Sequence, residues 1–390
     1  MYVILLITLN AVNIPKTFIL LVVFFLLVTC DSPKSKIKGT EGKKHPKETF
    51  IEYYDGKDKY SVGKDRKRDG LIKDIREGEV RYNKTSIFVE GARHVSVERD
   101  TFGNIFVLDE RNNKLYRYDV SDSTYSVLAD NTPGPKSISG AVGLDIHNKN
   151  VYVSTRKMKI LEYYCNAEGC EYRDTNTLNF MPRSIAVTDD KLYTLGFAFS
   201  DEIDKQKFES IIQEIENGKV ENSFGKAYNS KNPIVTFKMN RGPLEEICNG
   251  KLLFSLRDTP YIRKFSEGKM NSLYEISNFK LPTYREGSNP PSLTINQSTS
   301  ASTILEISAI GNKKAVVSVL ERSWDREFSK KRPRKVHKQS IKYYLIEPGS
   351  KEHSYLGRVK GNINEMPYVL FNTGKPVVVE NGRIYLAEYD

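Results

Sequence analysis

Short apolar segments alternate with turns rich in Gly, Asn and Asp along most of the chain after the first ninety residues. The clearest example is Gly103–Asp119, which reads G-N-I-F-V-L-D-E-R-N-N-K-L-Y-R-Y-D and predicts a strand, a turn and a second strand. Gly, Asn and Asp are typical of tight hairpin turns because they tolerate the positive φ that such turns require. The outline recurs at intervals of tens of residues, which indicates a repeat architecture whose units pack against their neighbours.

Five copies of this unit each predict an inner and an outer hairpin. The inner hairpins join His94–Val97 to Ile105–Leu108, Val142–Ile146 to Val151–Ser154, Ser184–Val187 to Lys191–Leu195, Leu244–Cys248 to Lys251–Ser255, and Ile304–Ile310 to Lys314–Leu320. The outer hairpins begin with the strands Leu115–Tyr118, Ile160–Tyr163, Ile211–Ile215, Tyr261–Phe265 and Ile341–Leu345. The segment Ile211–Ile215 also fits helical spacing, but Asn217 and Gly218 directly after it favour a hairpin.

The inner strands Ile105–Leu108 and Leu252–Phe254 are apolar on both faces, which indicates that neighbouring sheets cover them on both sides. Four strands per unit, stacked face to face and repeated radially, describe the blades of a β-propeller. A sixth copy, Pro367–Tyr389, contains short segments for only three strands. A strand from the N-terminal part of the chain would complete it.

The predicted fold class is therefore all-β: a six-bladed β-propeller of four-stranded antiparallel blades over residues 49–390, with the ring closed by an N-terminal strand. Three segments are candidates for the closing strand: Phe50–Tyr54, Tyr60–Val62 and Ser86–Glu90. A truncated gene product is the alternative explanation for the incomplete sixth copy.

The repeat Gly103–Asp119 resembles that of the NHL and TolB-like six-bladed propellers, and the chain from about Phe50 to Asp390 resembles the six-bladed propeller lipoproteins of the Bacteroidota. The first copy matches best. The resemblance implies the fold much more than the function, because propellers host many unrelated activities. Some six-bladed propellers are lactonases or lyases that hold a divalent cation in the channel, so the resemblance also implies an enzymatic alternative.

Residues 1–29 differ from the rest because Lys16 is their one charged residue. Lys16 followed by Thr17–Val28 predicts a secretory signal, and Met1–Pro15 is then an extension from a misassigned start. The end of this segment, Leu-Val-Thr-Cys, resembles a bacterial lipobox and implies lipidation of Cys30, although Gly, Ala or Ser is usual in place of Thr29. The predicted location is the cell envelope, as a membrane-anchored lipoprotein that is periplasmic or surface-exposed. An uncleaved anchor or a secreted protein is the alternative.

Residues 30–48 are polar and rich in Lys, Pro and Gly, which predicts a flexible tether between the anchor and the propeller. Cys165 and Cys170 flank the predicted tip of the second outer hairpin, so they are expected to form a disulfide outside the cytoplasm. Cys248 lies in an apolar inner strand and is expected to be a small core residue.

The predicted loops on one face of the propeller carry many cationic residues. Loops that join strand two to strand three, and strand four to the next blade, emerge on the same face and contain most insertions, where propellers usually bind ligands. Arg93, Arg183 and Arg241 each precede an innermost strand and are expected to surround the channel entrance. Guanidinium groups suit carboxylates or sulfates because they donate two parallel hydrogen bonds. The alternative is that each arginine pairs with an acid such as Glu245 or Glu306 for structural reasons.

Three further residues on this face are candidate ligand contacts: Arg257, and the neighbours Trp324 and Arg326 in the insertion Glu321–Ser340. Trp324 is either a platform for a sugar or an anchor of its loop. The formal net charge of +11 suggests an anionic partner. No nucleic-acid-binding motif accompanies it, and an exported protein rarely meets nucleic acid.

The principal functional hypothesis is a non-enzymatic propeller that binds a peptide, a protein or an anionic glycan through this basic face, as a monomer and without a cofactor. A metal-dependent channel hydrolase or lyase that resembles the lactonases is the alternative, with calcium as the possible cofactor. The inner strands supply Glu98, Asp145, Glu245, Glu246 and Glu306 for such an ion, but no matching set of Asn residues. Neither a nucleophile elbow nor a phosphate-binding loop is present in the sequence.

Overall fold

The computed structural model describes residues 58–62, 81–89, 95–188, 191–196, 210–228, 239–248, 250–281, 284–288, 291–295, 300–310, 313–324, 336–350, 353–360, 368–371 and 376–388. All of these belong to Gly42–Asp390, one of the two compact units of the chain. The predicted signal, Cys30, the tether, Phe50–Tyr54, Arg93 and Arg326 lie outside the described residues. None of the described residues forms a helix long and apolar enough to span a membrane.

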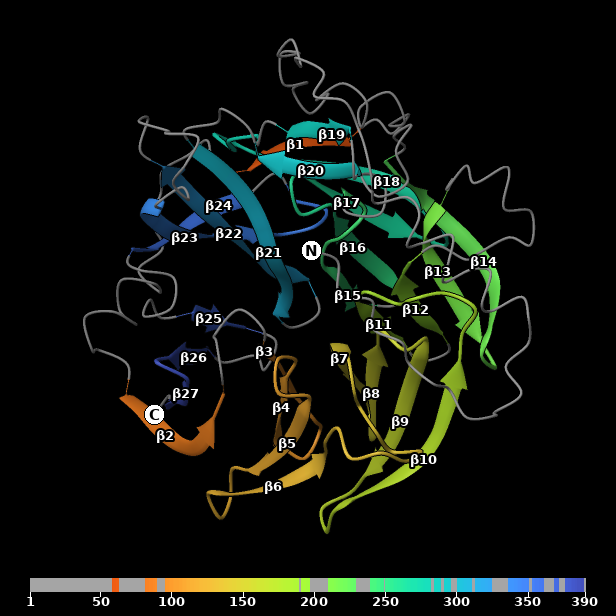
Figure 1. Ribbon diagram of the computed structural model, residues 1–390. Helices are drawn as coiled ribbons and strands as arrows, with labels where there is room; N and C mark the ends of the chain where they lie inside the picture. Colours follow the sequence, from red (N-terminus) through yellow and green to blue (C-terminus); the bar gives the residue numbers. More distant parts are fainter. Residues whose placement is uncertain are drawn as a thin grey trace, which may run out of the picture. The chain divides into compact units, whose positions relative to one another are not determined.

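Among the described residues, six blades stand around a centre, each a sheet of four antiparallel strands ordered from the centre outward, and blade four carries a fifth strand at its outer edge (Figure 1). Blade one contains β3 (Val95–Arg99), β4 (Ile105–Asp109), β5 (Lys114–Asp119) and β6 (Thr124–Ala129). Blade two contains β7 (Ala141–His147), β8 (Asn150–Thr155), β9 (Lys159–Cys165) and β10 (Cys170–Thr177). Blade three contains β11 (Ile185–Val187), β12 (Leu192–Leu195), β13 (Ser210–Glu216) and β14 (Lys219–Lys226).

The next two blades follow the same order. Blade four contains β15 (Leu244–Cys248), β16 (Lys251–Ser255), β17 (Tyr261–Ser266) and β18 (Lys269–Ile276). Blade five contains β21 (Ser300–Ile310), β22 (Lys314–Trp324), β23 (Val336–Ile346) and β24 (His353–Lys360). The predicted outer hairpin of blade three is confirmed, since β13 and β14 pair antiparallel and Asn217 and Gly218 have φ values of 50° and 75°.

Blade six confirms the predicted ring closure. Its inner strands are β25 (Tyr368–Leu370), β26 (Val377–Glu380) and β27 (Arg383–Glu388), and its outermost strand is β2 (Arg81–Phe88) from the N-terminal part of the chain. The two distant segments pair antiparallel, with Arg81 opposite Glu388 and Phe88 opposite Arg383. The six-bladed, all-β fold predicted from the sequence is therefore confirmed.

Three segments of the structure differ from the prediction or were not predicted. Tyr60–Val62 does not close the ring: it belongs to β1 (Asp58–Val62), which pairs parallel with β18 as a fifth strand on the outer edge of blade four. The insertion Glu321–Ser340 is not loop throughout, because β22 continues to Trp324 and pairs there with Val336 of β23. The insertion before β21 contains a separate hairpin of β19 (Tyr284–Ser288) and β20 (Pro291–Ile295).

The packing between blades explains why the second strands are apolar on both faces. All five residues of β4 are buried. Ile105 and Val107 pack in the hydrophobic cluster that contains blade six, whereas Phe106 and Leu108 pack in the cluster that contains blade two. Each sheet therefore contributes to two interfaces, and the hydrophobic core is distributed around the ring.

The structure joins Cys165 and Cys170 by a disulfide across the outer hairpin of blade two. The two residues stand directly opposite each other in the register of β9 and β10, with their Cα atoms 4.1 Å apart. Cys248 is a free cysteine at the end of β15. The prediction that it is a core residue was wrong, because its side chain is half-buried and lines a pocket.

Candidate functional site

The centre of the ring contains a cavity of about 320 Å³. The inner strands supply its walls, and the segments next to these strands supply four arginines and one glutamate. We call these five residues the arginine mouth: Glu110, Arg156, Arg183, Arg241 and Arg257. They come from blades one to four, so four neighbouring sheets together form the site.

Backbone hydrogen bonds hold the arginines of the mouth beside the inner strands. The amide of Arg183 donates to the carbonyl of Leu195 at 2.8 Å, and the amide of Arg156 donates to Gly140 at 2.8 Å. The amide of Arg257 donates to the carbonyl of Arg241 at 2.7 Å, so these two residues are fixed side by side. The arginine backbones are therefore positioned before any ligand binds.

The electrostatics of the mouth are unfavourable for its own cations. Burial, followed by the positive charges of Arg241 and Arg156, lowers the pKa of Arg183 to about 10. A shift of this kind means that the guanidinium groups repel one another in an environment with little water. In addition, Nε of Arg257 is buried and has no hydrogen-bond partner among the described residues. An anion in the cavity would relieve both costs.

The carboxyl groups deeper in the channel connect neighbouring blades. Oδ2 of Asp145 in β7 accepts a hydrogen bond from the amide of Val187 in β11 at 2.6 Å. Oε1 of Glu245 in β15 accepts from the amide of Ala309 in β21 at 2.9 Å. These contacts replace the hydrogen bonds that the innermost strands cannot make with each other, so both acids have a structural role.

A third acid, Glu306 in β21, accepts a hydrogen bond from the hydroxyl of Tyr368 in β25 at 2.6 Å. Burial raises the pKa of Glu306 and that of Asp145 to about 7, and raises the pKa of Glu245. The alternative interpretation of the arginines had named Glu245 and Glu306 as their partners. Glu245 has a described hydrogen bond from the amide of Ala309, and Glu306 has one from the hydroxyl of Tyr368.

The residues of the channel do not fit the divalent cation that the family resemblance implies. No group of three or more His, Cys, Asp or Glu within the described part of the chain is arranged to hold a metal ion. Amides also occupy oxygens of Asp145 and Glu245, and Oε1 of Glu246 accepts from the amide of Gly250 at 3.0 Å. The positive charge of the mouth opposes the approach of a cation.

The structure brings together three of the residues predicted as ligand contacts: Arg183, Arg241 and Arg257 line one cavity. Trp324 is the last residue of β22, and only its backbone is described. Sequence reasoning did not place Arg156 or Glu110 at the channel. Both follow directly after the second strand of their blade, but no local signal separates them from the other charged residues of these turns.

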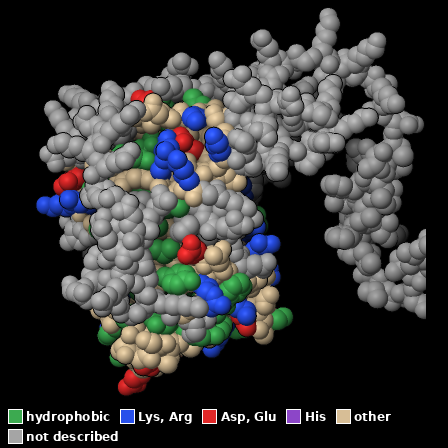
Figure 2. All heavy atoms as spheres, turned by 90° about the vertical axis from the view of Figure 1, so that its left-hand side faces the viewer, with side chains coloured by type: hydrophobic (Ala, Val, Ile, Leu, Met, Phe, Trp, Pro, Cys, Tyr) green, Lys and Arg blue, Asp and Glu red, His purple; other side chains and the backbone are tan. Residues whose placement is uncertain are grey.

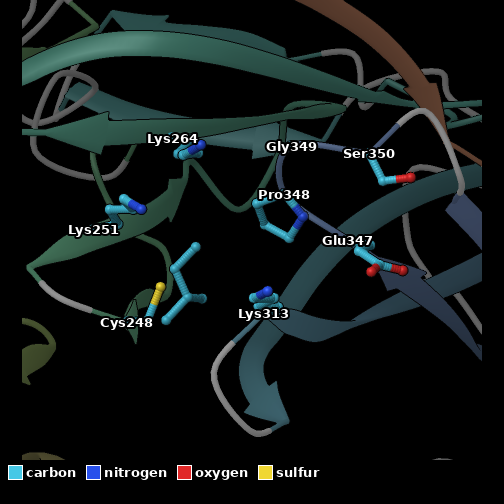
Figure 3. Close-up of a pocket in the computed structure, with 9 residues that line it drawn as sticks. Cys248, Lys251, Lys264, Lys313, Glu347, Pro348, Gly349 and Ser350 are labelled. Carbon is cyan, nitrogen blue, oxygen red and sulfur yellow. The ribbon is translucent and has the colours of Figure 1, made fainter.

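A second cavity, of about 340 Å³, lies between blades four and five. We call it the lysine pocket. Figure 3 shows the amino groups of Lys251, Lys264 and Lys313 on different sides of Pro348, with the Cys248 sulfur nearby. Its residues lie in or near the turns that join strands one to two and three to four, which are on the opposite face from the mouth. The lysines of this pocket are therefore suitable controls for variants of the arginines in the mouth.

The positive charge of the protein is not confined to one patch. Figure 2 shows the side of the ring that carries blades five and six, where Lys and Arg side chains are interspersed with acidic and hydrophobic ones. The net charge therefore does not by itself locate a binding surface. The cavity differs from this surface, because four arginines line it together.

Comparison with known proteins shows the fold. No protein-family model matches the chain, and no curated protein sequence matches it. A Bacteroides fragilis protein thought to be exported has a similar structure, with a TM-score of 0.53, 10% identity, and 85% of this chain and 99% of that chain covered. A streptogramin B lyase has a TM-score of 0.43 and 11% identity, with 80% of this chain and 98% of that chain covered. The chain therefore shares its fold with the Bacteroides fragilis protein.

Proposed function

We propose that this protein is an exported propeller that binds an anionic group of a peptide, a protein or a glycan in the arginine mouth, without turning it over. The observation that carries the proposal is the convergence of four arginines on one cavity of about 320 Å³. A cavity of this size admits a carboxylate or sulfate group with part of the molecule that carries it. The structural similarity to a Bacteroides fragilis protein thought to be exported supports a location outside the cytoplasm.

The planar guanidinium group is well suited to this task. It donates two parallel hydrogen bonds to a carboxylate or a sulfate, whereas a lysine acts as a point charge. Nε of Arg257 is a buried donor for which the described residues supply no acceptor. An oxygen of the ligand at this place would satisfy it, at a gain of about 1.5–3 kcal/mol for a hydrogen bond that involves a charge.

The arginine variants test this proposal, with inorganic sulfate and D-glucuronate as probes in isothermal titration calorimetry. Arg183→Ala and Arg241→Ala are each expected to weaken binding by about tenfold or more, because each removes a charge-assisted contact. Lys313→Ala in the lysine pocket removes the same charge and is expected to change affinity less than about twofold, since exposed charges are screened. Equal losses in all three variants would mean that net charge, and not the mouth, attracts the anion.

We also propose that the protein is tethered to a membrane through lipidated Cys30. The support is the sequence pattern of Thr17–Cys30, which matches a secretory signal followed by most of a lipobox. Radioactive palmitate supplied to a bacterial host is expected to label the full chain, and Cys30→Ser is expected to abolish the label. Equal labelling of Cys30→Ser and wild type would refute the anchor and would leave the proposed binding function untouched.

A further inference from the structure

The arginine mouth contains one acid among its cations, and this acid occupies a repeated position. Glu110 directly follows β4 of blade one, and Arg156 directly follows β8 of blade two. Arg257 stands just after β16 of blade four. Blade one therefore supplies a carboxyl group where two other blades supply guanidinium groups, and all three line the same cavity.

Five residues from different elements of the ring act on Glu110: four charged residues and one hydrogen-bond donor. Arg257 and Arg156 attract its negative form from blades four and two, and Ser96 in β3 donates a hydrogen bond to it. The neighbouring Asp109 and Glu306 of β21 act on it with the opposite sign. Burial outweighs the two arginines and raises the pKa of Glu110 to about 7. Close to neutral pH, the mouth therefore exists both with and without a proton on this group.

The following inference rests on the proposed anion site. We propose that Glu110 contacts the bound anion as a neutral carboxylic acid, which donates its proton in a hydrogen bond to an anion oxygen. The ionised form disfavours the ligand in two ways, because it repels the anion and because it already neutralises part of the charge of Arg156 and Arg257. A buried carboxylic acid that stays neutral in order to donate a hydrogen bond is an established arrangement in proteins.

The direction of the pH dependence follows from this arrangement. A bound anion places negative charge beside Glu110, so its pKa in the complex lies above its pKa of about 7 in the free protein. Binding therefore takes up a proton at neutral pH. Affinity is constant at acidic pH, where Glu110 is already protonated, and falls by roughly tenfold between pH 6 and pH 8, by linkage.

Sulfate is the appropriate probe, because its own charge does not change between pH 6 and pH 8. Calorimetric titrations of the full chain at pH 6, 7 and 8, in buffers of different ionisation enthalpy, give affinity and proton uptake together. The wild type is expected to bind roughly tenfold more weakly at pH 8 than at pH 6, with net proton uptake at pH 7. Glu110→Gln, which imitates the neutral acid, is expected to bind with one affinity throughout, close to the wild-type value at pH 6.

Glu306→Gln is the matched control, because burial also raises the pKa of Glu306 to about 7, while its hydroxyl partner is Tyr368. It is expected to keep the pH dependence. A flat profile in Glu306→Gln together with an unchanged slope in Glu110→Gln would overturn the inference, as would a wild type that binds sulfate without proton uptake. Absence of sulfate binding by wild type and Glu110→Gln at every pH would refute the anion site itself.

Discussion

Replacing Ile87 in β2 by alanine is expected to lower the free energy of unfolding by about 3 kcal/mol. Ile87 lies nearly three hundred positions before β27, the strand with which β2 pairs. Only 1% of its surface is exposed, and it packs in the cluster formed by blades one, five and six. Truncation to alanine removes this buried surface and leaves a cavity at the seam where the ring closes.

The seam contains polar contacts as well as apolar ones. The hydroxyl of Thr85 donates to the carbonyl of Ile384 at 3.1 Å, at the irregular part of the pairing between β2 and β27. The amide of Val89 donates to Gly382 at 2.7 Å. A chain that begins after Val89 would lose all of these contacts and expose the edge of β27, so we expect it not to fold into a stable ring.

Urea denaturation of Ile87→Ala measures this contribution directly. The control is Val127→Ala in β6, an outer strand of the neighbouring blade, where 49% of the side chain is exposed. A small change is expected there, below about 1 kcal/mol. If both variants unfold at the urea concentration of the wild type, β2 does not hold the ring together.

The sequence predicted the strands more reliably than their ends. Repeated apolar segments with Gly and Asn turns located both hairpins of blades one to five, because these signals are local. The extension of β22 to Trp324 was not predictable in this way. The polar segment Glu321–Ser323 resembles a loop, and its pairing with Lys338–Ser340 becomes visible only when the partner strand is in place.

The residues of the site also divide into those that local sequence signals predict and those that depend on the assembled structure. Arg183 and Arg241 were predicted at the channel because the residue before an innermost strand has a defined place in a blade. Glu110 and Arg156 occupy an equally defined place after the second strand, yet nothing in their sequence neighbourhood distinguishes them from the other charged residues of these turns. The raised pKa of Glu110 depends on burial and on arginines from two other blades, so only the assembled ring shows it.

Gly242→Ala is expected to destabilise the protein by about 3 kcal/mol or more, through a backbone clash inside the arginine mouth. A Cβ atom at this position would clash with the carbonyl oxygen of Ser255 and would lie 3.2 Å from the amide nitrogen of Arg257. Both are backbone atoms at the end of β16, so no side-chain rotation relieves the contact. The amide of Ser255 also donates to the carbonyl of Pro243 at 3.2 Å, which shows how closely the two segments approach.

The clash should affect binding as well as stability, because the segment that must move carries Arg241 and its partner Arg257. We expect Gly242→Ala to unfold at lower urea concentration and to bind sulfate more weakly under conditions where it remains folded. Gly169→Ala is the control, since a Cβ there would meet no atom within 4 Å. A variant that loses stability but keeps the wild-type affinity for sulfate would contradict the expectation that Arg241 and Arg257 bind the anion together. The close backbone approach at Gly242 would then contribute to folding but not to binding.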